Sequence, residues 1–161
     1  MQIRALDPVA DLVAVAALYS EAAAFWMLTD RKPPDLQKAA EFFTDCPPEC
    51  DPGRSHRLGL FESERLIGVA ELSFGFPKSN DGYLGLMLLS PSARGRGLGP
   101  VFLHHIETLA RAQSCTRLCL GVLEENTMAR AFWERQGFRP SGVSRFDGQT
   151  GHTIHRLEKA I

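Results

Sequence analysis

The chain has 161 residues, with 18 basic and 19 acidic side chains and a formal net charge of −1. This length is typical of one domain with a sizeable core, so we expect a single domain over residues 1–161. The balanced charge excludes a global field that would attract nucleic acid or a membrane surface. Apolar runs are interrupted well before about 18 residues and the N-terminus lacks an apolar signal segment, which predicts a cytoplasmic protein.

The first half of the chain alternates between helical and strand patterns. Apolar residues from 8 to 28 fit a long helix or a helix with a break, and the Arg31-Lys-Pro-Pro34 segment stops it. Asp35 can cap a second helix that runs to Phe43, and a loop over 45–55 follows. The strands expected in this half are 2–6, 56–62 and 65–74.

Four cysteines raise the question of a metal site. Cys46 and Cys50 form one C-x₃-C pair, and Cys115 and Cys119 form another. Structural zinc sites use tighter C-x₂-C spacings, and residues four apart in a strand lie too far apart to share an ion. We therefore expect no metal and predict reduced thiols, with the role of Cys46 and Cys50 left open.

Residues 94–99, Arg-Gly-Arg-Gly-Leu-Gly, join an apolar strand at 83–89 to a helical pattern that begins at Leu98. A strand that breaks into a glycine turn and opens a helix directs several backbone N–H groups at one point. The helix dipole adds partial positive charge there. The three glycines let the backbone approach a phosphate closely. The local pattern predicts a diphosphate cradle.

Other interpretations of this turn are weaker. A Walker loop requires a Lys followed by Ser or Thr after the glycines, and neither dipeptide is present. A dinucleotide-binding turn requires G-x-G-x-x-G and an acidic residue about 20 positions later, whereas no acid occurs over 115–121. A glycine-rich loop without any ligand remains the alternative for this motif taken alone.

A second pattern lies downstream, where 115–122 predicts a strand and Asn126 follows as a natural helix N-cap. The helix ends where Gly137 suits the left-handed C′ position. The two patterns are R-x-x-G-x-G, from Arg94 to Gly99, and N-x-x-A-x-x-F-W-x-x-x-G-F, from Asn126 onward. Together they resemble the two signature elements of the GNAT superfamily of N-acetyltransferases. By element order the resemblance extends over roughly residues 2–158.

The resemblance implies an α/β (α+β) GNAT fold, a mixed central sheet of about seven strands flanked by about four helices. Two final strands, expected at 138–146 and 152–158, agree with the element order of the family. It also implies transfer of an acetyl group from acetyl-coenzyme A, the cosubstrate, directly to a primary amine of a small molecule or peptide. Members of the family often form homodimers, so a homodimer is a further expectation.

The resemblance also assigns the residues that contact the cofactor. Backbone amides of Leu88 and Leu89 face the thioester oxygen, Asn126 lies beside the cofactor, and main-chain amides of the glycine turn hold the pyrophosphate. The two arginines of the turn contact phosphate, and an aromatic side chain packs against the pantetheine. The expected cofactor-binding set is Leu88, Leu89, Arg94, Gly95, Arg96, Gly97, Leu98, Gly99, Asn126 and Trp133.

A lysine-like amine with a pKa of about 10.4 is mostly protonated at neutral pH, so a base must remove a proton. Glu71 is the first candidate, because it interrupts an apolar strand and alternation places it on one face with Ile67 and Val69. Apolar surroundings raise a carboxyl pKa. Alternatively, that face is open to water and Glu71 is merely solvated or paired with an arginine. Asp81 and Tyr83, at the start of the next strand, are the second choices.

The chain departs from the family pattern at Trp133, where many members carry a tyrosine that protonates the leaving thiolate. An indole N–H is a donor but no usable acid, so the general acid is unassigned. A thiolate with a pKa of about 8.5 can leave without one. Trp133 is also the feature that supports the alternative function, a non-catalytic acyl-coenzyme A-binding module.

Selectivity for the acceptor is expected in two segments. The aromatic cluster Phe25-Trp26-Met27 is either core or a wall of the acceptor pocket, and the 45–55 loop lies where binding residues often occur. The identity of the amine does not follow from the scaffold. RNA binding through Arg94 and Arg96 is not expected, because two arginines make no basic stripe.

Overall fold

The computed structural model describes residues 1–161. Strands and helices alternate along the chain, with two short 3₁₀ turns, η1 and η2. Their bounds are β1 (Gln2–Ala5), α1 (Leu12–Glu21), α2 (Ala23–Asp30), α3 (Leu36–Glu41), η1 (Pro52–Arg54), β2 (His56–Glu62), β3 (Arg65–Phe74), β4 (Asp81–Leu89), η2 (Pro91–Ala93), α4 (Leu98–Ala112), β5 (Arg117–Leu123), α5 (Thr127–Arg135), β6 (Arg139–Asp147) and β7 (His152–Ala160).

The seven strands form one sheet in the order β1-β2-β3-β4-β5-β7-β6. All neighbouring strands are antiparallel except β4 and β5, which run parallel. β7 is inserted between β5 and β6, so the sheet does not follow chain order at this end. The expected mixed sheet of seven strands is confirmed.

The apolar segment 8–28 forms a helix with a break, the second of the two expected forms, and so gives α1 and α2. Ala22, with φ −96° and ψ 27°, leaves the helical conformation between α1 and α2. This break is the reason that the fold has five α-helices rather than about four. No single helix is long and apolar enough to cross a membrane; α1 and α2 satisfy that test only when taken together, across a bend of 81°.

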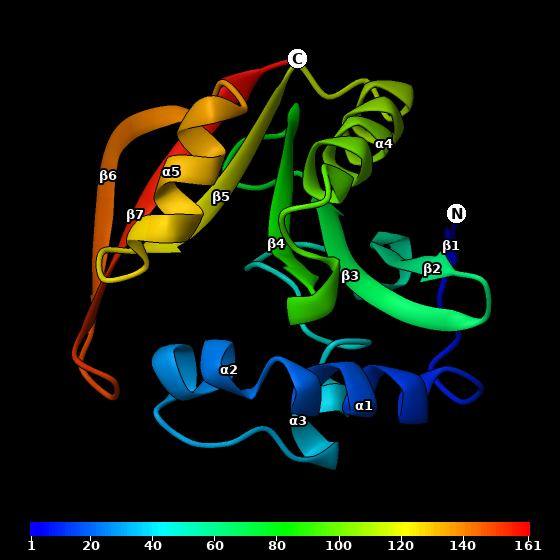
Figure 1. Ribbon diagram of the computed structural model, residues 1–161. Coiled ribbons are helices and arrows are strands. Elements are labelled where there is room, and N and C mark those ends of the chain that lie inside the picture. Colours follow the sequence, from blue (N-terminus) through cyan, green and yellow to red (C-terminus); the bar gives the residue numbers. More distant parts are fainter.

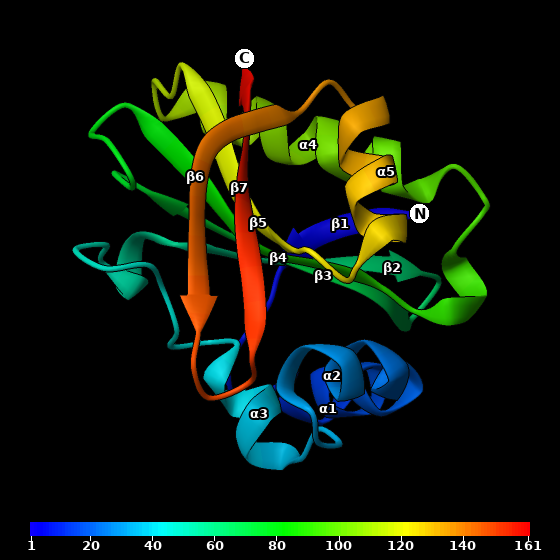
Figure 2. The same cartoon turned by 90° about the vertical axis from the view of Figure 1, so that its left-hand side faces the viewer.

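Helices cover both faces of the sheet (Figure 1, Figure 2). Helices α4 and α5 lie on one face, and α1, α2 and α3 lie on the other. Each face has its own apolar cluster, with Phe102 of α4 and Trp133 of α5 in the first and Tyr19 of α1 and Trp26 of α2 in the second. The central strands are therefore covered on both sides, and a polar side chain there needs a partner.

Two strands begin two residues away from the expected start. β4 begins at Asp81 rather than at 83, because Asp81 and Gly82 pair in parallel with Arg117 and Leu118 of β5. β5 begins at Arg117 rather than at 115. Cys115 therefore precedes the strand in which the sequence placed it.

The expected helix caps are confirmed. Asp35 Oδ1 accepts a hydrogen bond of 2.8 Å from the Lys38 N–H at the start of α3. Asn126 Oδ1 accepts one of 3.1 Å from the Ala129 N–H at the start of α5. Gly137 follows α5 with φ +94°, in the left-handed region that lets the chain reverse into β6.

Candidate functional site

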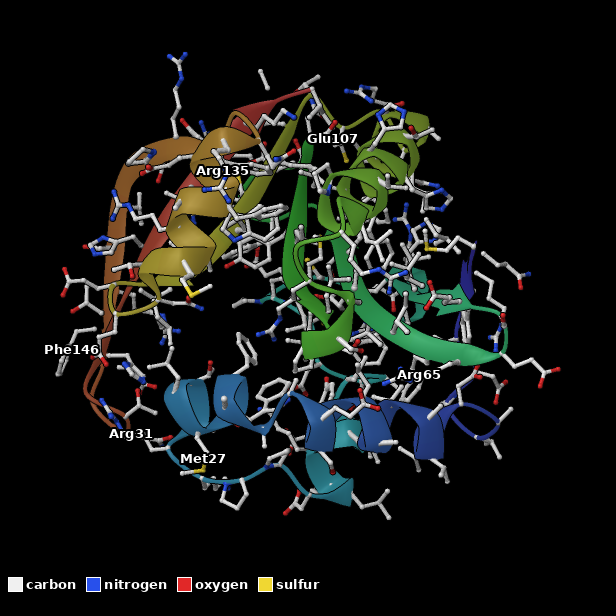
Figure 3. The ribbon with its side chains drawn as sticks, viewed as in Figure 1. Met27, Arg31, Arg65, Glu107, Arg135 and Phe146 are labelled. Atoms are coloured by element: carbon white, nitrogen blue, oxygen red, sulfur yellow. The ribbon has the colours of Figure 1, made fainter.

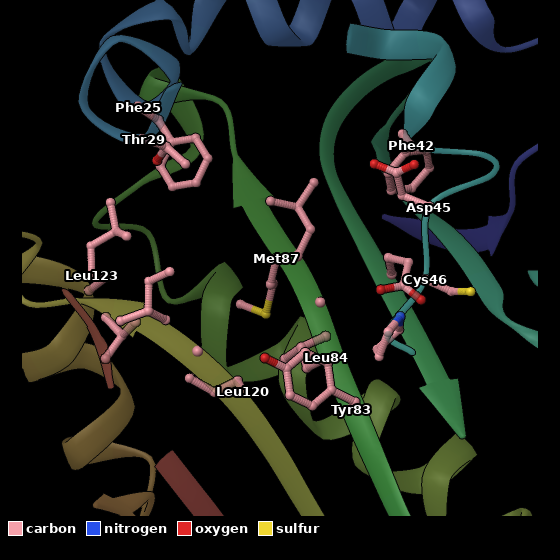
Figure 4. A pocket seen from close by; sticks show the side chains of 18 of the residues that line it. Phe25, Thr29, Phe42, Asp45, Cys46, Tyr83, Leu84, Met87, Leu120 and Leu123 are labelled. Atoms are coloured by element: carbon pink, nitrogen blue, oxygen red, sulfur yellow. The ribbon is translucent and has the colours of Figure 1, made fainter. Parts of the chain in front are cut away.

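The parallel strands β4 and β5 separate after a short paired segment. They pair only from Asp81 with Arg117 to Tyr83 with Cys119, and beyond that point no residues of the two strands are in register. The facing edges are open from Leu84 on β4 and from Leu120 on β5. A cavity of about 760 Å³ lies in this opening (Figure 4).

The cavity reaches both faces of the sheet. From β4 it is lined by residues 83–87, from β5 by residues 120–123, and from α5 by Asn126, Ala129 and Trp133. On the other face Phe25 and Thr29 of α2 lie across from Phe42, Asp45 and Cys46, which belong to the end of α3 and the loop after it (Figure 4). Both halves open onto the unpaired edge of β4, where successive backbone groups point alternately to either side.

The glycine turn lies between the end of β4 and the start of α4. Gly95 and Gly97 have φ values of +71° and +76°, and a Cβ built on either would meet no atom within 4 Å. Gly97 is the N-cap residue of α4 and supplies no side-chain cap. The first N–H groups of a 15-residue helix are thus left for a partner at an open position, a suitable site for an anion.

The two arginines of the turn already have partners. Arg94 Nε donates to the Leu89 carbonyl at 3.3 Å, and Arg96 Nη2 lies 2.5 Å from Glu62 Oε1. The hydrogen bond from Arg96 lowers the pKa of Glu62. Both arginines are exposed, so these contacts are weak and exchangeable.

The other expected cofactor residues lie around this turn. Leu88 and Leu89 pair with Val69 and Gly68 of β3 at the end of β4, beyond the cavity lining. A Cβ at Gly99 would lie 3.0 Å from Phe132 Cε2, so glycine allows the first turn of α4 to approach α5. The Leu98 side chain is buried in the core cluster on this face.

Trp133 lines the cavity while it packs into the core. The residue is 8% exposed, and its ring meets Phe132 and Phe138 edge to face at centroid distances of 4.9 and 5.3 Å. The neighbouring Asn126 uses its side chain as the α5 cap. Both residues therefore shape the cavity wall from positions that are held by the fold.

Glu71 is 5% exposed and lies at the cavity wall, so it is not solvated, but the alternative of pairing with an arginine is present in the structure. Its carboxylate accepts a short hydrogen bond from Ser73 Oγ and lies 3.8 Å from Arg57 Nη1. Burial raises its pKa, even though Ser73 and Arg57 act in the opposite direction. A Cβ at Gly85 would fall on Glu71 Oε2, so glycine at the β4 bulge makes room for the carboxylate.

The side chains that share a face with Glu71 differ from those expected. Val69 packs in the cluster on the α1 face, but Ile67 packs in the cluster on the α4 face. The register of β3 with β2 shifts here, since Gly68 pairs with Leu60 and Leu66 pairs with Phe61. This bulge interrupts the alternation, and the grouping of Ile67 with Glu71 is wrong.

Of the two second-choice catalytic residues, only Tyr83 lines the cavity. Asp81 does not line the cavity; Arg117 holds its carboxylate through contacts of 2.9 and 2.6 Å, and the Lys78 N–H donates to it. The bond from Arg117 lowers the pKa of Asp81. Tyr83 does line the cavity, and burial raises the pKa of its phenol.

Several polar residues near Glu71 are absent from the sequence-based set. Arg57 is in register with Glu71 across β2 and β3, and Ser55 Oγ lies 2.7 Å from Ser73 Oγ. Alternation along β3 places Ser73 on the face of Glu71 and could have revealed it. The position of Arg57 depends on the pairing register, which the sequence does not disclose.

The acceptor-selectivity segments are only partly at the cavity. Phe25 and Trp26 line it, while Met27 is 48% exposed and points away (Figure 3). Of the 45–55 loop, residues 45–48 line it. Cys46 and Cys50 are free thiols that donate to the carbonyls of Cys50 and Phe74 at 3.3 and 3.2 Å.

Hydrogen bonds connect the β6–β7 hairpin to the end of α2 beside the cavity. Arg31 Nε, just after α2, donates to the Thr150 carbonyl at 2.6 Å, and Arg31 lies next to the hairpin in Figure 3. The buried His152 bonds the Leu28 carbonyl through Nε2 at 2.6 Å and meets Glu125 through Nδ1 at 3.2 Å. These contacts join segments more than 100 residues apart into one wall.

Comparison with solved structures identifies the same fold in several proteins. An acetyltransferase from Thermus thermophilus is similar with a TM-score of 0.79 and 23% identity, covering 99% of this chain and 96% of that one. A ribosomal-protein-alanine N-acetyltransferase from Brucella melitensis has a TM-score of 0.73 and 19% identity over all of both chains. An N-acetyltransferase from Thermoplasma acidophilum, solved in complex with coenzyme A, has a TM-score of 0.72 and 19% identity, covering 99% of this chain and 98% of that one.

Two curated relatives match part of the chain. A peptidyl-lysine N-acetyltransferase of Salmonella typhimurium is 32% identical over 73 residues, which is 45% of this chain and 47% of the relative. A mycothiol acetyltransferase of Beutenbergia cavernae is 33% identical over 75 residues, 47% of this chain and 25% of the relative. The chain therefore spans less than half the length of either relative.

The family model of the GNAT acetyltransferases matches residues 15–138. This range includes the point where β4 and β5 separate, the glycine turn and α5. This is most of the chain, and it agrees with the fold of the solved structures. The chain belongs to the acetyltransferase (GNAT) family.

Proposed function

We propose that this chain transfers the acetyl group of acetyl-coenzyme A to a primary amine. The observation that carries the proposal is the buried Glu71, with a raised pKa, at the wall of a cavity that opens between β4 and β5. The family uses acetyl-coenzyme A, which supplies a thioester carbonyl for the amine to attack. No further cofactor is needed for this reaction.

The residues of the donor half fit such a ligand. The open edge of β4 offers alternating N–H and C=O groups to the amides of an extended chain, and Leu88 and Leu89 end that edge. The positive-φ glycines and the uncapped start of α4 suit the diphosphate, with Gly95, Leu98 and Gly99 shaping the turn. Arg94 and Arg96 reach phosphate by exchanging their present contacts, and Asn126 and Trp133 form the opposite wall.

In the acceptor half, Glu71 removes the proton from the incoming ammonium group. Freeing an amine with a pKa of about 10.4 at neutral pH requires a base near the point of attack. Ser73 and Arg57 position the Glu71 carboxylate and stabilise its charged form. Tyr83 lines the cavity beside it as a protonated phenol, whereas we assign Asp81 to the ion pair with Arg117 and not to the chemistry.

We place the enzyme in the cytoplasm, supported by its four free cysteines. The second candidate, a non-catalytic acyl-coenzyme A-binding module, is favoured by Trp133, which occupies the position of the usual acid and is held in the core. Release of free thiol with a panel of primary amines distinguishes the two. Binding of acetyl-coenzyme A without thiol release with any amine would favour the module.

A pair of glycine variants tests the cradle itself. We expect acetyl-coenzyme A to raise the melting temperature of the wild type, and Gly97→Leu to abolish that shift. Gly142→Leu is the matched control, because Gly142 in β6 also has a positive φ, +86°, and open space around its Cβ position. Loss of the shift in both variants, or in neither, would contradict a cradle at this turn.

A further inference from the structure

The charged side chains that line the cavity form two groups. Glu71 of β3 and Asp45 of the loop after α3 lie in a mixed group, in which the cations Arg57 and Lys38 are paired with carboxylates. Arg145 of β6 and Arg156 of β7 supply basic groups from the strands beyond β5. Tyr83 also lines the cavity; burial raises the pKa of its phenol, while Arg156 and Arg145 act to lower it.

Neither of the two arginines forms an ion pair, although the exposed Arg145 helps to lower the pKa of the nearby Asp147. Neither Arg145 nor Arg156 lies within 4.0 Å of a carboxylate oxygen, whereas Lys38, another lining cation, is paired with Asp30 and Glu41. Arg156 is half-buried, and its guanidinium lies 5.1 Å from the centre of the Phe76 ring. The guanidinium of such an arginine is positioned by the aromatic ring, and its N–H groups remain available to bind a carboxylate through two hydrogen bonds.

A second observation concerns donors that lack partners. The buried side-chain nitrogen and oxygen atoms without a hydrogen bond are Trp26 Nε1, Thr29 Oγ1, and Nε and Nη2 of Arg57. All three residues line this same cavity. Three of the four atoms are N–H groups that can only donate, so the wall is complementary to a ligand rich in acceptor oxygens.

We propose that the acceptor is a primary amine that carries a carboxylate on the same molecule, with the amine at Glu71 and the carboxylate at Arg156 and Arg145. This inference rests on the proposed function and narrows its substrate class. The aromatic walls, formed by Phe25, Trp26, Phe42 and Phe76, favour an acceptor with an apolar side chain or stem. A polycation such as a polyamine would meet unpaired arginines and is disfavoured.

The test compares acceptors that differ only in the carboxylate. One pair is L-phenylalanine and L-phenylalaninamide, the other is 6-aminohexanoate and hexylamine, and spermidine represents the polycations. Acetylation is followed by thiol release at several pH values, so that differences in amine pKa do not enter. We expect kcat/KM for at least one carboxylate to exceed that of its uncharged counterpart by about tenfold or more, as charged hydrogen bonds allow.

Variants then locate the carboxylate. Arg156→Gln should raise KM for the preferred carboxylate by about tenfold and leave its uncharged counterpart unchanged, and Arg156→Lys should recover part of the loss. Arg145→Gln gives a second, independent variant. Arg139→Gln is the control, because Arg139 also belongs to β6, is exposed, and neither lines the cavity nor meets a carboxylate.

The outcomes separate this inference from the transferase itself. Equal or better rates with the uncharged acceptors or spermidine, or equal losses for both members of a pair in Arg156→Gln, would overturn the inference and leave the transferase intact. If no amine is acetylated, calorimetry measures whether the same acceptors bind to the coenzyme A-loaded protein. Carboxylate binding that depends on Arg156 then supports the inference alone, and its absence overturns both.

Discussion

The half of the cavity near α5 is lined by β4, β5 and α5, and only the glycine turn and α4 come between these elements in the chain. The half near α2 and α3 combines α2, the loop after α3, β3 and the β6–β7 hairpin, which are distant in sequence. The glycine turn and the start of α4, which lie beyond the cavity lining, add backbone amides to the first half, whereas the second half consists of side chains such as Glu71 and Arg156. A ligand common to a family can be held by main chain, and a ligand particular to one member requires side chains.

Replacing the proposed base should show the largest difference between the two halves of the cavity: a loss of rate without a loss of cofactor binding. Glu71→Gln keeps the size and the contact with Ser73 but cannot accept a proton at neutral pH, so we expect kcat to fall by about 10²–10⁴-fold. The thermal shift with acetyl-coenzyme A should stay unchanged, because Glu71 lies outside the glycine turn. Steady-state kinetics and thermal shift measure the two effects.

Glu107→Gln is the matched control for this change. Glu107 of α4 is also a buried glutamate, 6% exposed and paired with Lys159, but it does not line the cavity. It should lower the melting temperature with little effect on kcat. A rate for Glu71→Gln close to that of the wild type would assign the base to another group.

A change in the donor half should have the converse effect. Gly99→Val places methyl groups against Phe132, 3.0 Å from the Cβ position, and should destabilise the fold by about 1–3 kcal/mol. Because the contact lies where α4 meets α5, we also expect KM for acetyl-coenzyme A to rise, with KM for the amine unchanged. Gly148→Val, with no atom within 4 Å of its Cβ position, should change neither quantity. An increase confined to the amine KM would contradict the division into halves.

The smallest effect concerns the charge state of Glu71. Burial raises its folded pKa above the ordinary value, so the carboxylate form, and with it the rate, is lost as the pH falls through that raised value. Ser73→Ala removes a bond that favours the carboxylate, and the acidic limb of kcat/KM should move to higher pH by about one unit. Ser90→Ala, which removes another fully buried serine, should leave the limb in place.

What the sequence predicted follows the same division. The caps at Asp35 and Asn126 and the left-handed Gly137 depend on local propensity, the seven-strand mixed sheet was implied by the family resemblance, and the structure confirms them all. The candidates from Leu88 to Gly99 lie around one turn because they are neighbours in the chain, while Asn126 and Trp133 come from α5 and its cap. In that half the local sequence pattern alone was enough to predict the proposed site.

The acceptor half was less predictable, because it depends on register and on long-range packing. The bulge in β3 moves Ile67 to the other face, and pairing across β2 and β3 brings Arg57 to Glu71. Asp81 was a reasonable candidate by position, but its partner Arg117 comes from a strand whose register with β4 the sequence does not give. That Arg145 and Arg156 line the cavity depends on the packing of the β6–β7 hairpin against α2, which the sequence does not show.

The insertion of β7 between β5 and β6 has a consequence for biosynthesis. While a nascent chain lacks residues 152–160, β5 has an uncovered edge along Arg117–Leu123 and β6 has no strand to pair with. The segments up to α5 can condense on the ribosome, but the wall that contains Arg156 cannot form until the final strand has been translated. Truncated translation products would therefore keep the glycine turn at residues 94–99 and lack the wall that contains Arg156.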